Sequence, residues 1–152
     1  VVNVDAGAEM TTGVNIHMVM SVAGGTGAGS FITIANAIKK KWGNEVNLYG
    51  YGVTHSIFRA MDVTGIKTPN VELNAISALI DLDYLQTASD SNPIEIELGG
   101  KKTTLTEPAF DGFYVIDNTS DKGYMLKTVN ELCEVIGTCL YACVGRTLTL
   151  CP

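Results

Sequence analysis

The residues of this chain best suited to chemistry lie in one glycine-rich loop, residues 23–30, which read Ala-Gly-Gly-Thr-Gly-Ala-Gly-Ser. Because glycine has no Cβ, an anion can lie against the backbone N–H groups of such a loop. The hydroxyl groups of threonine and serine add donors. The loop therefore predicts a phosphate-binding site, whose candidate residues are Gly24, Gly25, Thr26, Gly27, Ala28, Gly29 and Ser30.

The segments on either side would position this loop. Residues 16–22 are nearly all apolar, which is typical of a buried parallel strand, and His17 is therefore expected in the core. Residues 31–42 carry apolar side chains at helical spacing and end in Lys39, Lys40 and Lys41, which would offset the helix dipole at its C-terminus. A helix N-terminus beside the loop would add to its attraction for phosphate.

The rest of the pattern predicts an α/β fold, a mostly parallel sheet with helices on both faces. Residues 1–15 are expected to form a loop, and the helix at 122–144 to pack between two layers. A Gly-Gly pair with Glu95 and Glu97 on one side and Lys102 on the other predicts an inserted β-hairpin. The other expected elements are strands at 46–53 and 113–118, a helix at 71–85 with Asp81 and Asp83 on its outer side, and the hairpin at 94–105.

Composition excludes several classes of protein. The chain has 152 residues, 46% of them hydrophobic, which suits one domain with a real core. A net charge of −6 argues against a nucleic-acid or anionic-membrane surface, and no apolar stretch is long enough for membrane insertion. The cysteines lack metal-ligand spacing and are expected to be core thiols in a reducing cytosol: Cys133, Cys139, Cys143 and Cys151.

Three kinds of glycine loop compete for residues 23–30. A Walker loop needs a lysine after its last glycine, and this chain has Ser30 there. A Rossmann fingerprint needs a third glycine at that same position and an acidic residue at a strand end about twenty residues on. This chain has Ser30 in place of the glycine and no clear acidic residue of that kind. Without a mismatch, the loop resembles the signature loop of the tubulin and FtsZ superfamily, in which a small residue precedes Gly-Gly-Thr-Gly, a small residue and Gly.

Further matches follow in the family's order and extend the resemblance over most of residues 16–144. An Asn-Ala helix start at Asn74, a strand that ends in Ile-Asp-Asn at Asn118, and Asn130 on a long helix are similar to the family's pattern. The sequences of the loop and of residues 78–85 resemble those of bacterial tubulin-like proteins more than those of eukaryotic tubulin. An aromatic residue is usual one turn before the second asparagine, and this chain has Leu126 there, with Tyr124 a weak substitute.

The resemblance implies roles for particular residues. Asn118 and Asn130 would select guanine, because a carboxamide matches the donor and acceptor edge of the base. Arg59, Glu72 and Asn74 would lie on the ribose side. GTP or GDP would bind with Mg²⁺ bridging the phosphates, although no dedicated metal ligand is identifiable.

The resemblance also implies head-to-tail self-association into filaments in the cytoplasm, with GTP hydrolysed where subunits meet. The family's first glycine loop and its acidic water-activating loop have no counterpart here. Catalytic residues therefore stay unassigned, and residues 1–152 are expected to form a single partial domain, the second half of a tubulin-like nucleotide domain. Two alternatives stay open: a Rossmann-type NAD(P)-binding oxidoreductase module, and a nucleotide-free tubulin-like scaffold.

Overall fold

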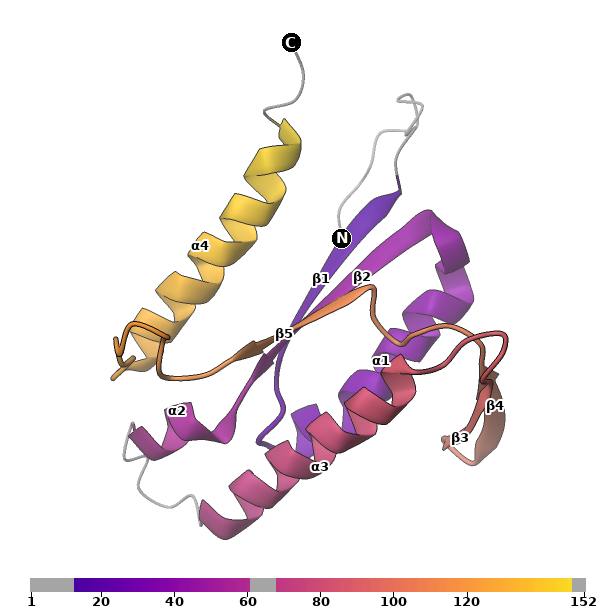
Figure 1. The fold of residues 1–152 in the computed structure, drawn as a ribbon, viewed down its shortest axis with the longest axis horizontal. Helices are drawn as coiled ribbons and strands as arrows, with labels where there is room; N and C mark the ends of the chain where they lie inside the picture. Colours follow the sequence, from indigo (N-terminus) through magenta and orange to yellow (C-terminus); the bar gives the residue numbers. More distant parts are fainter. Residues whose placement is uncertain (1–12, 61–67, 149–152) are drawn as a thin grey trace.

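The fold is an α/β arrangement around a parallel sheet, seen in a computed structural model that describes residues 13–60 and 68–148. Its sheet has the order β1-β2-β5, with Val14 opposite Val46 and Tyr49 opposite Gly112. Helices lie on both faces, as predicted (Figure 1). The elements are β1 (Val14–Ser21), α1 (Gly25–Trp42), the short 3-10 helix η1 (Gly43–Glu45), β2 (Val46–Val53), α2 (His55–Ala60), α3 (Thr68–Gln86), β3 (Ile94–Leu98), β4 (Lys101–Leu105), β5 (Gly112–Ile116) and α4 (Val129–Leu148).

One face of the sheet carries the main core, under α1 and α3. Phe31 of α1 stacks with Phe110, and Phe113 of β5 meets Phe110 edge-on, with ring centroids 5.2 Å apart. These rings fit because β2 has glycine beneath them: a Cβ on Gly50 would lie 2.4 Å from the Phe113 ring. The glycines of β2 therefore hold the space for an aromatic core.

The other face is only partly covered. Helix α4 packs there through a small buried cluster, Val53, Ile57, Leu126 and Leu132. The expectation that this helix lies between two layers is wrong for the described residues, since Tyr141 is 79% exposed. The three cysteines described on α4 are exposed rather than in the core: Cys133, Cys139 and Cys143. Residue 151 lies outside the described residues.

The same open face changes the interpretation of the first strand. His17 is half-buried rather than enclosed in the core; its ring stacks on Tyr49, and its Nδ1 lies 3.0 Å from the Tyr51 hydroxyl. β1 is an edge strand within the described residues, because its hydrogen bonds run to β2 alone. Its alternate side chains are therefore partly exposed, and the prediction of a fully buried strand is wrong.

Several helices and strands begin at other residues than predicted, for local reasons. β2 matches its prediction, whereas β1 begins at Val14 and includes residues that were expected in a loop. α1 begins within the glycine loop, at Gly25. α4 begins only at Val129, because the preceding residues form a tight turn in which Gly123 has a φ of 77° and donates to Ser120.

The structure also corrects the role that was expected of Lys39. Instead of merely offsetting the helix dipole, its side chain is 9% exposed and its Nζ lies 2.7 Å from the Asp111 carboxylate. Asp111 also accepts the Leu48 N–H at 2.6 Å. Partial burial would raise the pKa of Asp111, but the bonds from Lys39 and from the Leu48 N–H outweigh it and lower that pKa. The pair ties α1 to the residue that precedes β5.

The predicted hairpin is confirmed. Gly99 and Gly100 have φ values of 57° and 77°, as a two-residue turn of this kind requires, and Glu97 lies opposite Lys102. Ile94 and Leu105, directly opposite each other, are 2% and 8% exposed and anchor the hairpin to the main core. None of the helices in the described ranges combines the length and apolar character that a bilayer crossing needs.

Candidate functional site: the glycine end of helix α1

The N-terminus of α1 is left open by the chain itself. Gly24 is its N-cap and supplies no side-chain hydrogen bond, and the first turn holds no acidic residue. The Ala28 N–H donates to the Gly24 carbonyl at 2.9 Å, which is the first bond of the helix. The N–H groups of Gly25, Thr26 and Gly27 therefore precede the helical bonding pattern. Three donors at a positive dipole end are suited to an anion.

The glycines of the loop do two different things. A Cβ built on Gly24, Gly25 or Gly29 would meet no heavy atom within 4 Å. A Cβ on Gly27 would lie 1.9 Å from the Ser21 carbonyl oxygen. Gly27 is therefore required for α1 to approach the end of β1, whereas the other glycines leave open space beside the free N–H groups.

Two of the predicted loop residues already have partners in the helix. The Ser30 hydroxyl donates to the Thr26 carbonyl at 2.6 Å, and the Ala28 N–H is used by Gly24. Ser30 thus does not direct its proton toward the open end. Thr26 is exposed and has no hydrogen bond from its own hydroxyl among the described residues.

The parallel sheet brings this loop to the same edge as other predicted residues. All three strands run in one direction, so the segments after β1, β2 and β5 meet at the carboxyl edge, toward the lower left of Figure 1. Asn118 follows β5 at that edge. Asn74 of α3 donates to the Ala23 carbonyl at 3.4 Å, which places the predicted ribose-side residue on the loop. Ligands of open α/β sheets bind at this edge.

Asp117 was not assigned a role from the sequence, yet it organises the end of β5. Its carboxylate accepts hydrogen bonds from the hydroxyls of Ser56 and Thr54 and from the Asn118 N–H at 2.7 Å. The hydrogen bond from Ser56 is the largest cause that lowers the pKa of Asp117. Partial burial acts in the opposite direction, whereas the bonds from the Asn118 N–H and Thr54 and the nearby His55 lower this pKa further. A carboxylate at the end of a parallel strand was the signal that could have identified it.

These bonds hold Asn118 in place. Its carbonyl accepts the Leu126 N–H at 2.7 Å, and its Oδ1 accepts the Thr119 hydroxyl at 3.0 Å. Leu126 is 5% exposed within the cluster under α4, so it is not available to stack on a ligand. Tyr124 is well exposed.

Asn130 lies in the first turn of α4 and is exposed. No hydrogen bond joins its side chain to Asn118 within the described ranges, so the two predicted guanine residues are not brought into direct contact. Glu72 is half-buried near the start of α3. Arg59 belongs to α2, but its side chain lies outside the described residues.

No group of three or more His, Cys, Asp or Glu side chains in the described residues is arranged to hold a metal ion. The open end of α1 offers N–H donors, which suit phosphate oxygens and not a cation.

One comparison with known proteins found a match, and it agrees with the fold. A protein-family model described as "Tubulin like" matches residues 2–148. No match was found among curated proteins or among solved structures. Because that family model covers nearly the whole chain, and the glycine loop, parallel sheet and helices lie as its resemblance implied, the chain belongs to the tubulin-like family.

Proposed function

We propose that this tubulin-like protein binds GTP or GDP at the glycine end of α1. The observation that carries the proposal is the uncapped helix N-terminus, where the N–H groups of Gly25, Thr26 and Gly27 lack helical acceptors. The open space beside Gly24 and Gly25 would admit a phosphate. Gly29 lies in the same turn, while Ala28 and Ser30 shape the helix start.

Guanine would be selected by Asn118, with Asn130 as the second carboxamide. Asn118 lies at the same sheet edge as the loop and is anchored through Asp117 and Leu126. Its Nδ2 has no hydrogen bond in the described residues and is free to donate to a base. Asn74 supports the ribose side, because it already bonds to the loop; Arg59 and Glu72 remain candidates there.

Self-association into head-to-tail filaments is part of the same proposal and follows from the family. Mg²⁺ would accompany the nucleotide, held by phosphate oxygens. GTP hydrolysis would require groups contributed at a subunit junction, and no residue of this chain is assigned to it.

The test is competition binding with labelled GTP, challenged by unlabelled GTP, ATP, NAD and NADP. We expect displacement by GTP and not by the dinucleotides. Gly25→Val should weaken GTP at least about 100-fold, because the side chain would occupy the phosphate space. Gly137→Val is the matched control, since Gly137 also has open space around its Cβ position but lies on α4.

Asn118→Ala separates the base from the phosphates. This variant should lower the affinity for GTP more than it lowers the affinity for ATP or for inorganic triphosphate. Equal losses for both nucleotides would remove Asn118 from the proposal. Displacement by NAD or NADP would assign the loop to a dinucleotide instead.

A further inference from the structure

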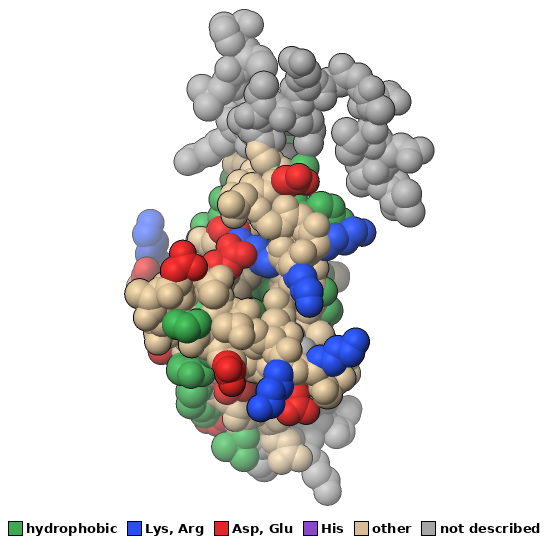
Figure 2. Space-filling view, turned by 90° about the vertical axis from the view of Figure 1, so that its right-hand side faces the viewer, with side chains coloured by type: hydrophobic (Ala, Val, Ile, Leu, Met, Phe, Trp, Pro, Cys, Tyr) green, Lys and Arg blue, Asp and Glu red, His purple; other side chains and the backbone are tan. Residues whose placement is uncertain are grey.

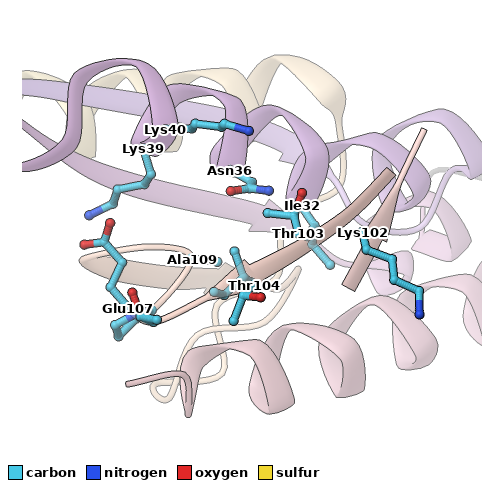
Figure 3. Close-up of a pocket in the computed structure, with 12 residues that line it drawn as sticks. Ile32, Asn36, Lys39, Lys40, Lys102, Thr103, Thr104, Glu107 and Ala109 are labelled. Atoms are coloured by element: carbon cyan, nitrogen blue, oxygen red, sulfur yellow. The ribbon is translucent and has the colours of Figure 1, made fainter. Parts of the chain in front are cut away.

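The hairpin insertion forms a groove with α1 that the nucleotide proposal does not use. A cavity of about 360 Å³ lies between α1 and the strand β4, shown in Figure 3. Asn36 in its wall is about 16 Å along the helix axis from Gly25, so the groove is separate from the glycine end. The cavity is lined by Ile32, Asn36, Lys39, Lys40, Lys102, Thr103, Thr104, Leu105, Thr106, Glu107, Pro108 and Ala109.

The lining residues place the groove along an edge of β4. Successive side chains of a strand point to opposite faces, so a cavity lined by the four consecutive strand residues 102–105 follows the strand's edge and not one of its faces. Among the described residues, β4 pairs with β3 alone. The outward backbone N–H and C=O groups of β4 therefore face the groove without a strand partner, which makes them a template for another strand.

The edge is held firmly at this position. Leu105 at the end of β4 and its partner Ile94 are buried in the main core. Beside them, Ile32 and Ala109 give the groove an apolar floor. A strand entering the groove would meet a preformed edge and would not need to order the hairpin first.

Two of the three charged side chains in the groove that lack an ion pair are basic. Lys39 is committed to Asp111, whereas Lys40, Lys102 and Glu107 have no ion pair in the described parts of the chain, which leaves the groove with a net positive charge. Figure 3 shows Lys39 and Lys40 toward one end and Lys102 toward the other, with Thr103 and Thr104 between. Figure 2 shows basic and acidic side chains interspersed on the face that carries the hairpin. Basic charge is notable in a chain of net charge −6.

We propose that the groove between α1 and β4 binds an extended acidic segment of a partner protein, which adds to β4 as a further strand. Backbone hydrogen bonds would supply affinity, alternate apolar side chains would contact the floor, and acidic side chains would meet Lys40 and Lys102. The chain already demonstrates this pairing chemistry: on its other edge β4 binds β3, whose sequence is Ile-Glu-Ile-Glu-Leu, with Glu97 opposite Lys102.

A second copy is the less suitable occupant. Two β4 edges pairing with each other would bring together strands that each carry Lys101 and Lys102 and no acidic residue. Like charges opposed across a strand pair are destabilising. An acidic strand from another protein avoids this cost.

The experiment measures fluorescence polarisation of a labelled Ile-Glu-Ile-Glu-Leu peptide with the whole protein. Two control peptides test the two features: one with lysine in place of glutamate, and one with alternate backbone nitrogens methylated. We expect saturable binding of the first peptide and at least tenfold weaker binding of both controls, because the first control removes charge complementarity and the second removes strand hydrogen bonds. Binding should also slow amide hydrogen exchange in β4.

Four surface variants locate the site. Lys40→Glu and Lys102→Glu should each weaken the peptide at least fivefold, whereas the neighbouring Lys41→Glu and Lys101→Glu, outside the cavity lining, should change it less than twofold. Thermal melts of each variant check that the fold is retained.

Three results would overturn the proposal: no saturable binding of the acidic peptide up to millimolar concentration, undiminished binding of the methylated peptide, or equal effects of the matched lysine variants. Loss of a dimer on Lys102→Glu, without peptide binding, would assign the groove to a second copy instead. Because GTP binding is measured separately, failure here leaves the proposed function unaffected.

Discussion

Helices α1 and α4 begin in different ways, although both start in loops that follow strands of the same parallel sheet. α4 is capped by its own chain: the Glu131 N–H donates to the Thr128 hydroxyl at 3.2 Å, and the Lys127 N–H donates to the Glu131 carboxylate at 2.6 Å. α1 begins at Gly24 with no side-chain cap and no acidic residue in its first turn.

The difference is the one that a phosphate site at the start of α1, as proposed, would require. A capped end has satisfied its donors and gains stability from its own residues. An uncapped, exposed end keeps its donors for water or for a ligand, and loses the stability that a cap would have contributed. The missing cap at α1 therefore supports the proposed anion site more directly than the glycine content of the loop does.

The largest expected effect tests which glycine of α1 is structural. Gly27→Ala should destabilise the fold by about 3 kcal/mol, because its Cβ would overlap the Ser21 carbonyl and force α1 away from β1. Gly25→Ala should change stability by less than about 1 kcal/mol. Chemical denaturation of both variants makes the comparison, and equal stabilities would contradict the close approach. If a Gly27 variant failed to bind nucleotide, the cause would therefore be the disturbed packing of α1 on β1 and not a lost contact with the phosphates.

The next prediction gives α1 the cap that it lacks. Gly24→Asp has room for its side chain and should raise stability by roughly 0.5 kcal/mol through the free N–H groups. The same carboxylate should weaken GTP about 100-fold, because it would repel phosphate and occupy its donors. Melting curves and GTP titrations measure the two changes. Unaltered GTP affinity would rule out phosphate at this helix end.

A third prediction concerns the opposite end of α1, where Lys39 and Asp111 form their pair. Asp111→Ala should cost about 2 kcal/mol, since it leaves a buried ammonium unpaired, and Asp111 is 37% exposed, which moderates the loss. Because the pKa of Asp111 is lowered on folding, the pair stabilises the fold above pH 3.8. That contribution declines as the pH falls from 3.8 through the lower folded pKa. Denaturation at pH 7 and at pH 3 should show a smaller difference between wild type and variant at pH 3.

The smallest expected effect lies at the capped helix. Thr128→Ala should destabilise the protein by about 1 kcal/mol through loss of the bond to the Glu131 N–H. GTP affinity should fall by no more than about fivefold, since this cap holds the first turn of α4, which carries the proposed guanine residue Asn130, and does not touch the proposed phosphate site. A large loss of GTP binding would indicate that the start of α4 and the phosphate site act as one unit.

Local features were predictable from the sequence because their causes lie within a few residues. The Gly-Gly pair determined a hairpin turn by its positive φ values, and the apolar run at 46–53 determined β2. The start of α4 was misplaced, since the turn around Gly123 and the cap at Thr128 outweighed apolar spacing.

Other features depended on contacts across the chain. Lys39 meets Asp111 over 72 residues, and Asp117 meets Ser56 over 61. No periodicity encodes such pairs, and the exposure of the cysteines on α4 likewise depends on what packs against that helix.

By itself, the sequence determined that a glycine loop lies between a strand and a helix, because glycine content and apolar spacing act locally. Only the tertiary structure decided which glycine is needed for packing, which N–H groups stay open and which edge of the hairpin faces α1. The physical reason is that steric overlap, hydrogen-bond satisfaction and exposure are properties of neighbours in space, and those neighbours come from distant parts of the chain.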